Sequence, residues 1–407
     1  MLHIQIGPSP LALGLLVPIT KAAGFAVCIV GRPGDDSPRR YGCAGTGPEG
    51  RLGYQAVEWF EGPKSLDDLP ADLLARIEVD EPLLLTCTLR DRVDQRRGFI
   101  EALLRRRPGN AETVALACEN APHQLYDEIA QICDELGVHY LRTVVNRMCI
   151  KRPPDSDGRR MVFAHSLGEW LVERPSQPCS LLDALEQVEE FEVVDDLEAR
   201  LARKLWMVNG AHQALALIAW EGNTGTLRVR FPDERAWREQ EDDLRAAAQD
   251  RTVSARLDHL HGAMDDALSV KHPGLVDNLG YGVKHVVAYS EHPDSIKRVL
   301  GSFLRLELTP FIETLDVRLA QPARICAARA HSVASFGFVF NVFESLAANL
   351  DAFLDAKVVR ANPGSIDPLD DLQAAEAYAR LVDGWMPEKE ATARVLRLAE
   401  GLADHRD

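Results

Sequence analysis

The first half of the chain alternates short apolar runs with stretches in which apolar residues have helical spacing. The apolar runs of strand length are Leu2–Ile6, Ala26–Val30, Pro82–Leu89, Thr113–Cys118 and Val138–Val145. The helix-like stretches between them include Arg97–Arg106 and Gln124–Leu136. Strands that alternate with helices are typical of βαβ units around a parallel sheet. The pattern therefore predicts a doubly wound α/β domain in this half.

From about Leu197 the pattern changes to long amphipathic stretches. These are Glu198–Trp220, Glu234–Ala248, Thr252–Leu268, Ser335–Asp355 and Leu372–Val382. Their length and spacing predict a mainly α-helical second domain. The acidic stretch around Glu189–Asp196 is the expected crossover. We therefore expect one domain over residues 1–195 and a helical domain over residues 196–407.

Composition narrows the class of protein without changing this layout. The chain has 407 residues, 46% of them hydrophobic, and a formal net charge of -16. Such a charge repels nucleic acid and anionic membranes, so we expect neither as a partner, and the arginine run 105–107 is expected to end a helix. The eight cysteines form no C-x2-C pair and no charged-then-apolar leader opens the chain, which favours the cytoplasm. We expect a small-molecule substrate and a monomer or small homo-oligomer.

The candidate chemistry concentrates between Lys204 and His212, where an amine, the amide of Asn209 and an imidazole follow one another. If residues 203–220 form an α-helix, about 100° per residue places His212 about 80° and Asn209 about 140° from Lys204. The three side chains then share one face and can meet a single alcohol or carbonyl. The spacing indicates proton and hydride chemistry.

Gly210 lies inside this helical pattern, at a cost of roughly 1 kcal/mol relative to alanine. Something should need the missing side chain, and close approach of a substrate or cofactor ring is one candidate. The alternative reading is an exposed lysine, a polar asparagine and a core histidine without a shared role.

The spacing K-x4-N-G-x-H resembles the signature of the polyol-specific long-chain dehydrogenases, the family of the mannitol dehydrogenases. Further segments that resemble the family's are Ala117–Asn120, Val145–Arg147, Gly168–Trp170, Leu300–Phe303 and Gln321–Arg324. The resemblance runs along most of the chain. It implies a Rossmann-like domain followed by a helical one, with the active site in the cleft between them.

The resemblance also implies a metal-independent mechanism in which the lysine matching Lys204 is the general acid and base. The asparagines matching Asn120 and Asn209 would donate hydrogen bonds to the developing alkoxide, each worth roughly 3 kcal/mol, and His212 would hold a substrate hydroxyl. The lysine must be neutral part of the time. Burial or a nearby cation such as Arg203 lowers a lysine pKa toward the working range.

The first βα turn, which starts at Gly7, is the expected nucleotide site. Dinucleotide-binding folds have the motif G-x-G-x-x-G at this turn. In this chain Gly7 matches the first glycine, Ser9 replaces the second, and Ala12 is an accepted variant of the third. Gly14 matches a further glycine of the resembling family, and the resemblance adds Glu119 to these cofactor-binding candidates. Pro18, inside the first helix, would cost roughly 3 kcal/mol unless the helix kinks or ends there.

After the second strand, Arg32 stands where a carboxylate would hold the ribose of NAD. An arginine suits a 2′-phosphate, so we favour NADP over NAD as the cofactor. Two alternatives stay open: Arg32 is a surface residue in a turn, or dinucleotide binding has been lost.

The residues expected to bind the substrate differ from the family pattern. Where the family has the aspartate of V-D-R, this chain has Asn146, followed by Arg147. Arg318 and Arg324 lie one position from where the family has an arginine and a lysine. An amide in place of a carboxylate removes a charge and adds donors, so the substrate is expected to be less polyhydroxylated or more anionic.

The sequence thus predicts a nicotinamide-dependent oxidoreductase that interconverts a sugar-like alcohol, phosphorylated and acidic compounds included, and its carbonyl form. The alternative is a non-redox descendant of the same fold that binds another small ligand and has lost normal dinucleotide binding, because a fold does not guarantee a chemistry. Ser9, Pro8 and the missing ribose carboxylate motivate that alternative.

Overall fold

The computed structural model of the protein divides into two compact units, Met1–Arg200 and Leu201–Asp407. It describes residues 1–31, 38–46, 57–60, 66–89, 94–118, 124–153, 156, 160–224, 244–291, 299–300, 314–328 and 333–336. We call the two parts the N-terminal unit and the C-terminal unit and describe each by itself.

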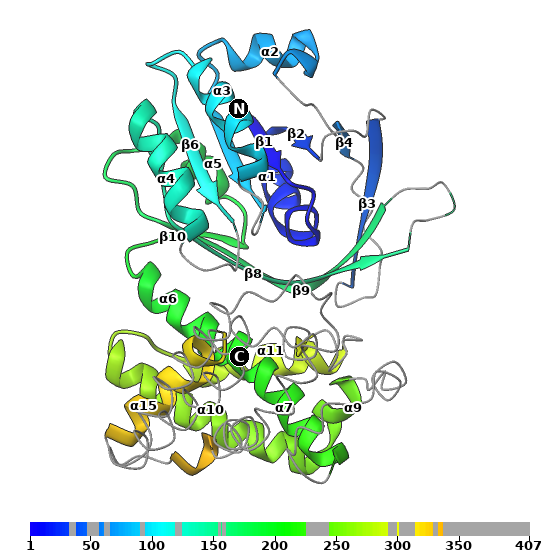
Figure 1. Ribbon diagram of the computed structural model, residues 1–407, viewed down its shortest axis with the longest axis vertical. Helices are drawn as coiled ribbons and strands as arrows, with labels where there is room; N and C mark the ends of the chain where they lie inside the picture. The colour runs from blue at the N-terminus through cyan, green and yellow to red at the C-terminus, as the bar shows by residue number, and fades with distance from the viewer. Residues whose placement is uncertain are drawn as a thin grey trace, which may run out of the picture. The chain divides into compact units, whose positions relative to one another are not determined.

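The N-terminal unit is built on one sheet, which has ten strands in the described part of the chain (Figure 1). The strands are β1 Leu2–Ile6, β2 Ala26–Val30, β3 Pro38–Thr46, β4 Val57–Phe60, β5 Leu83–Cys87, β6 Thr113–Ala117, β7 His139–Tyr140, β8 Thr143–Arg152, β9 Arg160–Glu173 and β10 Phe191–Val194. Their order is β10-β9-β3-β4-β2-β1-β5-β6-β7, with β8 beside β9. Strands β2, β1, β5, β6 and β7 pair in parallel throughout. The predicted parallel sheet is therefore confirmed.

Helices cover both faces of the parallel strands. One face packs against α2 (Ala71–Ile77), α3 (Asp94–Arg105) and α4 (Gln124–Leu136) through a core that includes Leu2 and Ile4. The other face packs against the π-helix η1 (Ala12–Leu16), α1 (Val17–Ala22) and α5 (Ser180–Leu185), through residues such as Leu84 and Leu116. Alternate residues of a strand point to opposite faces, so a strand buried on both faces, such as β5, is apolar at nearly every position. The doubly wound, Rossmann-like class is confirmed.

The predicted strand Val138–Val145 is wrong in its extent. The structure has two strands there, β7 parallel to β6 and β8 antiparallel to β9. Leu141, between them, is buried in the core under α5, so the apolar run continues where the strand breaks. The long β8–β9 pair and the strands β3 and β4 were not predicted. The acidic crossover stretch contains β10, which pairs in parallel with β9.

The first helix accommodates Pro18 by changing its hydrogen-bond register. Val17 N donates to Ala12 O, five residues back, and α1 begins at Val17 with the proline in its first turn. Proline is tolerated in a first turn, because its missing donor is not needed there. The carbonyl of Gly14, four residues before Pro18, accepts from Arg147 Nη1 at 3.0 Å. The side chain of Arg147 thus satisfies a carbonyl that Pro18 cannot serve.

The C-terminal unit is helical in its described part, as predicted. The segments are α6 Leu197–Arg203, which crosses the boundary between the units, the π-helix η3 Lys204–Gly210, α7 Ala211–Thr224, α9 Leu244–Gln249, α10 Arg251–Lys271, α11 Asn278–Glu291, the π-helix η4 Asp316–Ala320, α15 Gln321–Ala328 and the short η5 Val333–Phe336. The predicted helix Leu372–Val382, and most of Glu234–Ala248 and Ser335–Asp355, lie outside the described residues. None of the helices that can be described is long and apolar enough to cross a membrane.

Arg107 fastens the end of α3 to the neighbouring loops. The helix ends at Arg105, as the arginine run predicted, and the buried guanidinium of Arg107 donates to Ile77 O (2.8 Å), Val79 O (3.0 Å) and Thr113 Oγ1 (3.1 Å). Each of these oxygens would lose a hydrogen bond if the guanidinium were removed.

We expect Arg107→Lys to lower the free energy of unfolding by about 1 to 3 kcal/mol, because an ammonium cannot reach the same spread of acceptors and leaves buried carbonyls unsatisfied. Arg105→Lys is the matched control, since that side chain is 57% exposed and pairs with Glu101 on the helix surface. Its effect should stay within about 0.5 kcal/mol. Urea unfolding of both variants measures the difference, and equal effects would contradict the assignment.

Candidate active site

The sheet order reverses at β1, whose neighbours β2 and β5 lead to opposite sides of the sheet. In open α/β sheets, ligands bind outside the carboxyl ends of the strands at such a switch point. Gly7 follows β1, Thr88 follows β5 and Cys118 follows β6, so these residues mark the edge. The first candidate region is therefore the turn that begins at Gly7.

Gly7 has a backbone conformation and a packing that only glycine fits. Its φ is +87°, and a Cβ would lie 2.7 Å from Thr88 O. Its N–H donates to Val30 O at 2.9 Å and its carbonyl accepts from Thr88 Oγ1 at 2.7 Å. The turn is thus tied to β2 on one side and to the end of β5 on the other.

Ser9 opens the helical stretch that follows. Its Oγ accepts from Ala12 N at 3.1 Å, a side-chain cap for the first helical turn. Ala12 and Gly14 are buried, and a Cβ on Gly14 would lie 2.6 Å from Cys149 Sγ and 3.0 Å from Ala164 Cβ. Ala12 and Gly14 therefore let the first helix pack closely, while Gly7 and Ser9 form the turn itself.

Three predicted site residues, Arg32, Glu119 and Asn120, lie outside the described residues. The described chain leads up to them at the same edge, since Gly31 follows β2 and Cys118 follows β6, and both are buried.

Asn146 and Arg147 lie on β8, opposite Glu169 and Gly168 of β9. Asn146 is buried. Besides its bond to Gly14 O, Arg147 donates to His165 O at 2.6 Å and to Ser166 O at 3.3 Å. Its described contacts thus hold β8, β9 and the first helix together. These contacts give Arg147 a structural role in addition to the substrate-binding role expected from the sequence.

In the C-terminal unit the predicted α-helix around Lys204 is wrong in its geometry. Residues Lys204–Gly210 form the π-helix η3, and the α-helix resumes at Ala211. In a π-helix each hydrogen bond spans five residues instead of four, so residues five apart lie one turn above each other. Lys204 and Asn209 are five apart, and therefore come onto the same face more closely than in an α-helix.

His212 completes this face. It follows Asn209 by three residues, a separation at which neighbouring side chains of a helix meet. Lys204 is only 3% exposed, while Asn209 and His212 are half-buried. The reading of Lys204 as an exposed surface lysine is therefore wrong. We call Lys204, Asn209 and His212 the lysine face.

Gly210 makes room for a neighbouring backbone. A Cβ at this position would lie 2.7 Å from Arg318 O, a carbonyl of η4. The indole N–H of Trp206 donates to Val317 O at 3.1 Å, so the two π-helices meet at two successive carbonyls. The missing side chain is therefore explained by helix packing, and close approach of a substrate or cofactor ring is not needed to explain it.

A histidine of α10 holds the other side of η3. The Nε2 of His261 lies 3.1 Å from Met207 O, so this ring nitrogen carries the proton and donates. His261 is 2% exposed, and burial lowers its pKa, which favours the neutral ring. His261 is therefore a buried core residue of α10.

Three arginines of the C-terminal unit, Arg203, Arg318 and Arg324, carry the positive charge considered for this site. Arg203 is buried and its guanidinium lies over the ring of Tyr281, 4.0 Å from the centroid. Arg324 pairs with Asp316 at 2.6 Å, and Arg318 lies half-buried on η4. The contact between Tyr281 and Arg203 was not predicted, because one aromatic residue on a helix carries no signal of its partner.

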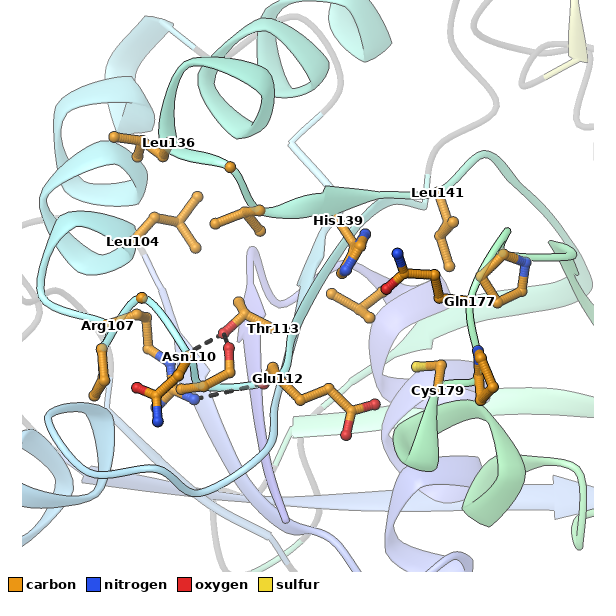
Figure 2. Close-up of a pocket in the computed structure, with 18 residues that line it drawn as sticks. Leu104, Arg107, Asn110, Glu112, Thr113, Leu136, His139, Leu141, Gln177 and Cys179 are labelled. Atoms are coloured by element: carbon orange, nitrogen blue, oxygen red, sulfur yellow. Dashed lines mark hydrogen bonds between the residues drawn. The ribbon is translucent and has the colours of Figure 1, made fainter.

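A separate cavity of about 370 Å³ lies at the opposite, amino edge of the sheet (Figure 2). Its lining includes Arg107, Glu112 and His139. Glu112 accepts from Ser180 Oγ at 2.6 Å and from Leu181 N at 3.3 Å, and so holds the start of α5. Arg107 and Glu112 are thus engaged in the fold. Within the described residues, no group of three His, Cys, Asp or Glu side chains could hold a metal ion.

Comparisons with known proteins agree with this architecture. No protein-family model and no curated protein sequence matches the chain. Among solved structures, a D-sorbitol dehydrogenase in substrate-free form aligns over 97% of this chain and 91% of its own, with a TM-score of 0.64 and 13% identity. A Pseudomonas fluorescens mannitol 2-dehydrogenase, in a ternary complex with NAD and D-mannitol, aligns over 98% of this chain and 94% of its own, with a TM-score of 0.55 and 16% identity. The chain therefore has a polyol dehydrogenase-like fold, as the sequence resemblance predicted.

We expect Gly210→Ala to destabilise the C-terminal unit by about 1 to 3 kcal/mol, because the new methyl group meets a backbone carbonyl that can move only with η4. Gly262→Ala is the matched control: Gly262 lies within α10 with open space around its Cβ position. That change should be neutral or stabilising by up to about 1 kcal/mol. Thermal unfolding of both variants tests the contact, and a Gly210→Ala protein as stable as the control would refute it.

Proposed function

We propose that this protein is a nicotinamide-dependent oxidoreductase that interconverts a sugar-like alcohol and its carbonyl form, with Lys204 as the general acid and base. The observation that carries the proposal is the lysine face, a buried amine one π-turn from an amide, in a chain whose fold is that of polyol dehydrogenases. Phosphorylated and acidic compounds are included among the candidate substrates.

The residues of the N-terminal unit fit a nucleotide at the carboxyl edge of the sheet. The Gly7 turn and the helix start capped by Ser9 provide a turn without a side chain at position 7 and a helix N-terminus, which favours phosphate groups. In the proposal, Gly7 and Ser9 approach the pyrophosphate, and Arg32 and Glu119 contribute from the segments after β2 and β6. When bound, a nicotinamide supplies or accepts the hydride.

The lysine face carries the proton chemistry. In the proposal, Lys204 Nζ takes the proton of the substrate hydroxyl during oxidation, for which the amine must be in its neutral form. The same amine, now protonated, returns the proton during reduction of the carbonyl. Asn209 donates a hydrogen bond to the oxygen as charge develops on it, and Asn120 is proposed for the same role. His212 holds a further substrate hydroxyl, while Asn146, Arg147, Arg318 and Arg324 are the proposed substrate-binding residues.

The second candidate function is binding of a different small ligand without redox chemistry. Ser9 supports it, because the side chain that replaces the usual glycine stands at the turn and its hydroxyl is already engaged with Ala12 N. This candidate predicts no fluorescence change of NADPH or NADH at millimolar concentrations, whereas the oxidoreductase predicts saturable binding in the micromolar range.

Replacing Lys204 should abolish turnover and leave the fold nearly intact. For Lys204→Met we expect kcat to fall by about 100- to 10,000-fold, the range of general acid–base catalysis. Lys204→Arg should fall as far, because a guanidinium keeps the charge but cannot release its proton. Steady-state kinetics with a panel of ketose phosphates, hexuronates and other small keto compounds measures the effect.

Lys271→Met serves as the control for a lysine in the same unit: its ammonium lies 5.3 Å from the centroid of the Trp206 ring, and its loss should spare turnover. Substantial activity in Lys204→Arg would show that charge alone suffices. A fall in melting temperature that matches the loss of kcat would mark Lys204 as structural.

For the cofactor we expect tighter binding of NADPH than of NADH, because Arg32 can pair with a 2′-phosphate. Fluorescence titration of both nucleotides measures the preference. Arg32→Ala should weaken NADPH binding by about tenfold, or about 1.4 kcal/mol, and leave NADH binding unchanged. Tighter binding of NADH by the native chain would reverse the assignment.

A further inference from the structure

The central strands of the N-terminal unit carry polar side chains where apolar ones would suffice. His3 and Gln5 on β1 and Thr86 on β5 are all 0% exposed. They point to the face opposite that of Leu2, Ile4 and Ile6, because alternate residues of a strand face opposite sides. A buried polar group costs free energy unless it is hydrogen-bonded. The cluster adjoins the Gly7 turn, because Gln5 donates to Gly7 O. Its hydrogen bonds can therefore act on the conformation of that turn.

The hydrogen bonds of the cluster have a single consistent direction. Thr86 Oγ1 donates to Gln5 Oε1 at 2.6 Å and lies 2.7 Å from His3 Nε2. Since the hydroxyl proton is used on Gln5, His3 Nε2 must donate to Thr86. In this tautomer His3 Nδ1 carries no proton and accepts from Thr20 Oγ1, 2.8 Å away, whose hydroxyl also lies 3.1 Å from Leu16 O and from Val17 O. Complete burial lowers the pKa of His3 to about 3, so the ring is neutral and this tautomer holds at neutral pH.

The chain of hydrogen bonds ends on the Gly7 turn. The carboxamide Nε2 of Gln5 donates to Ile6 O at 2.9 Å and to Gly7 O at 3.0 Å, and lies 3.1 Å from Thr88 Oγ1. Thr88 Oγ1 also donates to Gly7 O at 2.7 Å. A flipped amide would place Oε1 against two carbonyl oxygens, so these carbonyls fix the amide orientation, and Oε1 accepts from Thr86 Oγ1.

We propose that Gln5 is a positioning residue that sets the direction of the Gly7 carbonyl, and through it the conformation of the turn on which a nucleotide pyrophosphate rests. The Gly7 carbonyl lies beyond the end of β1, where the strand ladder no longer supplies donors. The side chains of Gln5 and Thr88 donate to this carbonyl instead, through Gln5 Nε2 and Thr88 Oγ1. His3 and Thr86 hold the carboxamide in the orientation that makes this possible. The inference rests on the proposed nucleotide binding.

The test compares Gln5→Met, which keeps the length of the side chain and removes both hydrogen-bonding atoms, with Ile4→Val on the same strand. Ile4 is 0% exposed and packs on the opposite face, so its truncation lowers stability without touching the Gly7 turn. For Gln5→Met we expect the Kd for NADPH to rise at least tenfold, while Ile4→Val stays within twofold of the native chain. Equal Kd values for the two variants at matched fractions of folded protein would overturn the proposal.

Amide hydrogen exchange provides a readout that does not require the nucleotide. The Gly7 and Thr88 amides donate to Val30 O and Ile6 O in the native turn. Their exchange should accelerate at least tenfold in Gln5→Met and stay unchanged in Ile4→Val. If the native chain binds neither NADPH nor NADH, the proposed function fails, and the exchange rates still decide whether Gln5 holds the turn. Unchanged exchange in Gln5→Met overturns that role as well.

Thr88→Val keeps the test decisive if Gln5→Met does not fold. It removes the second donor to the Gly7 carbonyl with almost no change of shape. We expect the same direction of change in Kd and in exchange, by a smaller factor, because Gln5 still donates to Gly7 O. A Thr88→Val protein identical to the native chain in both measurements would count against control of the turn through its carbonyl.

Discussion

The close approach of η3 and η4 at Gly210 is the contact on which the lysine face depends. Lys204 and Asn209 share one face because η3 has the wide register of a π-helix, in which residues five apart stack. Such a register is seldom stable alone. Here the carbonyls of Val317 and Arg318 meet η3 along one side, and His261 donates to Met207 O on another. The packing of three segments therefore determines which side chains of η3 point together.

The first helix of the N-terminal unit also contains a π-helical segment. The π-helix η1 follows the Gly7 turn, and the carbonyl of Gly14 receives its hydrogen bond from Arg147 on β8. In η1 and in η3, a helix carbonyl is thus served by a side chain of another element. Both segments lie where function is proposed, one beside the nucleotide turn and one under the acid–base lysine. Widened helical turns are frequent at functional sites, because they aim side chains that a regular helix would separate.

Much of the fold followed from local pattern. The predicted strands Leu2–Ile6 and Ala26–Val30 and the helix Gln124–Leu136 agree residue for residue with β1, β2 and α4, because each is bounded by residues that end its periodicity. Val138–Val145 failed for the opposite reason: Leu141 stays apolar through the break between β7 and β8. The π register of η3 was also beyond reach, since the same apolar spacing suits an α-helix and only neighbours from distant parts of the chain select the wider turn.

The sequence by itself determined the class of the fold, the division into an α/β part and a helical part, and the residues that carry candidate chemistry. These depend on periodicity and residue type, which are local properties. Only the tertiary structure decided that Lys204 is buried, that Asn209 lies one π-turn from it, that Gly210 accommodates Arg318 O, and that Gln5 is bonded to the Gly7 turn. Each of these depends on contacts between residues far apart in the chain, and no spacing along the sequence encodes them.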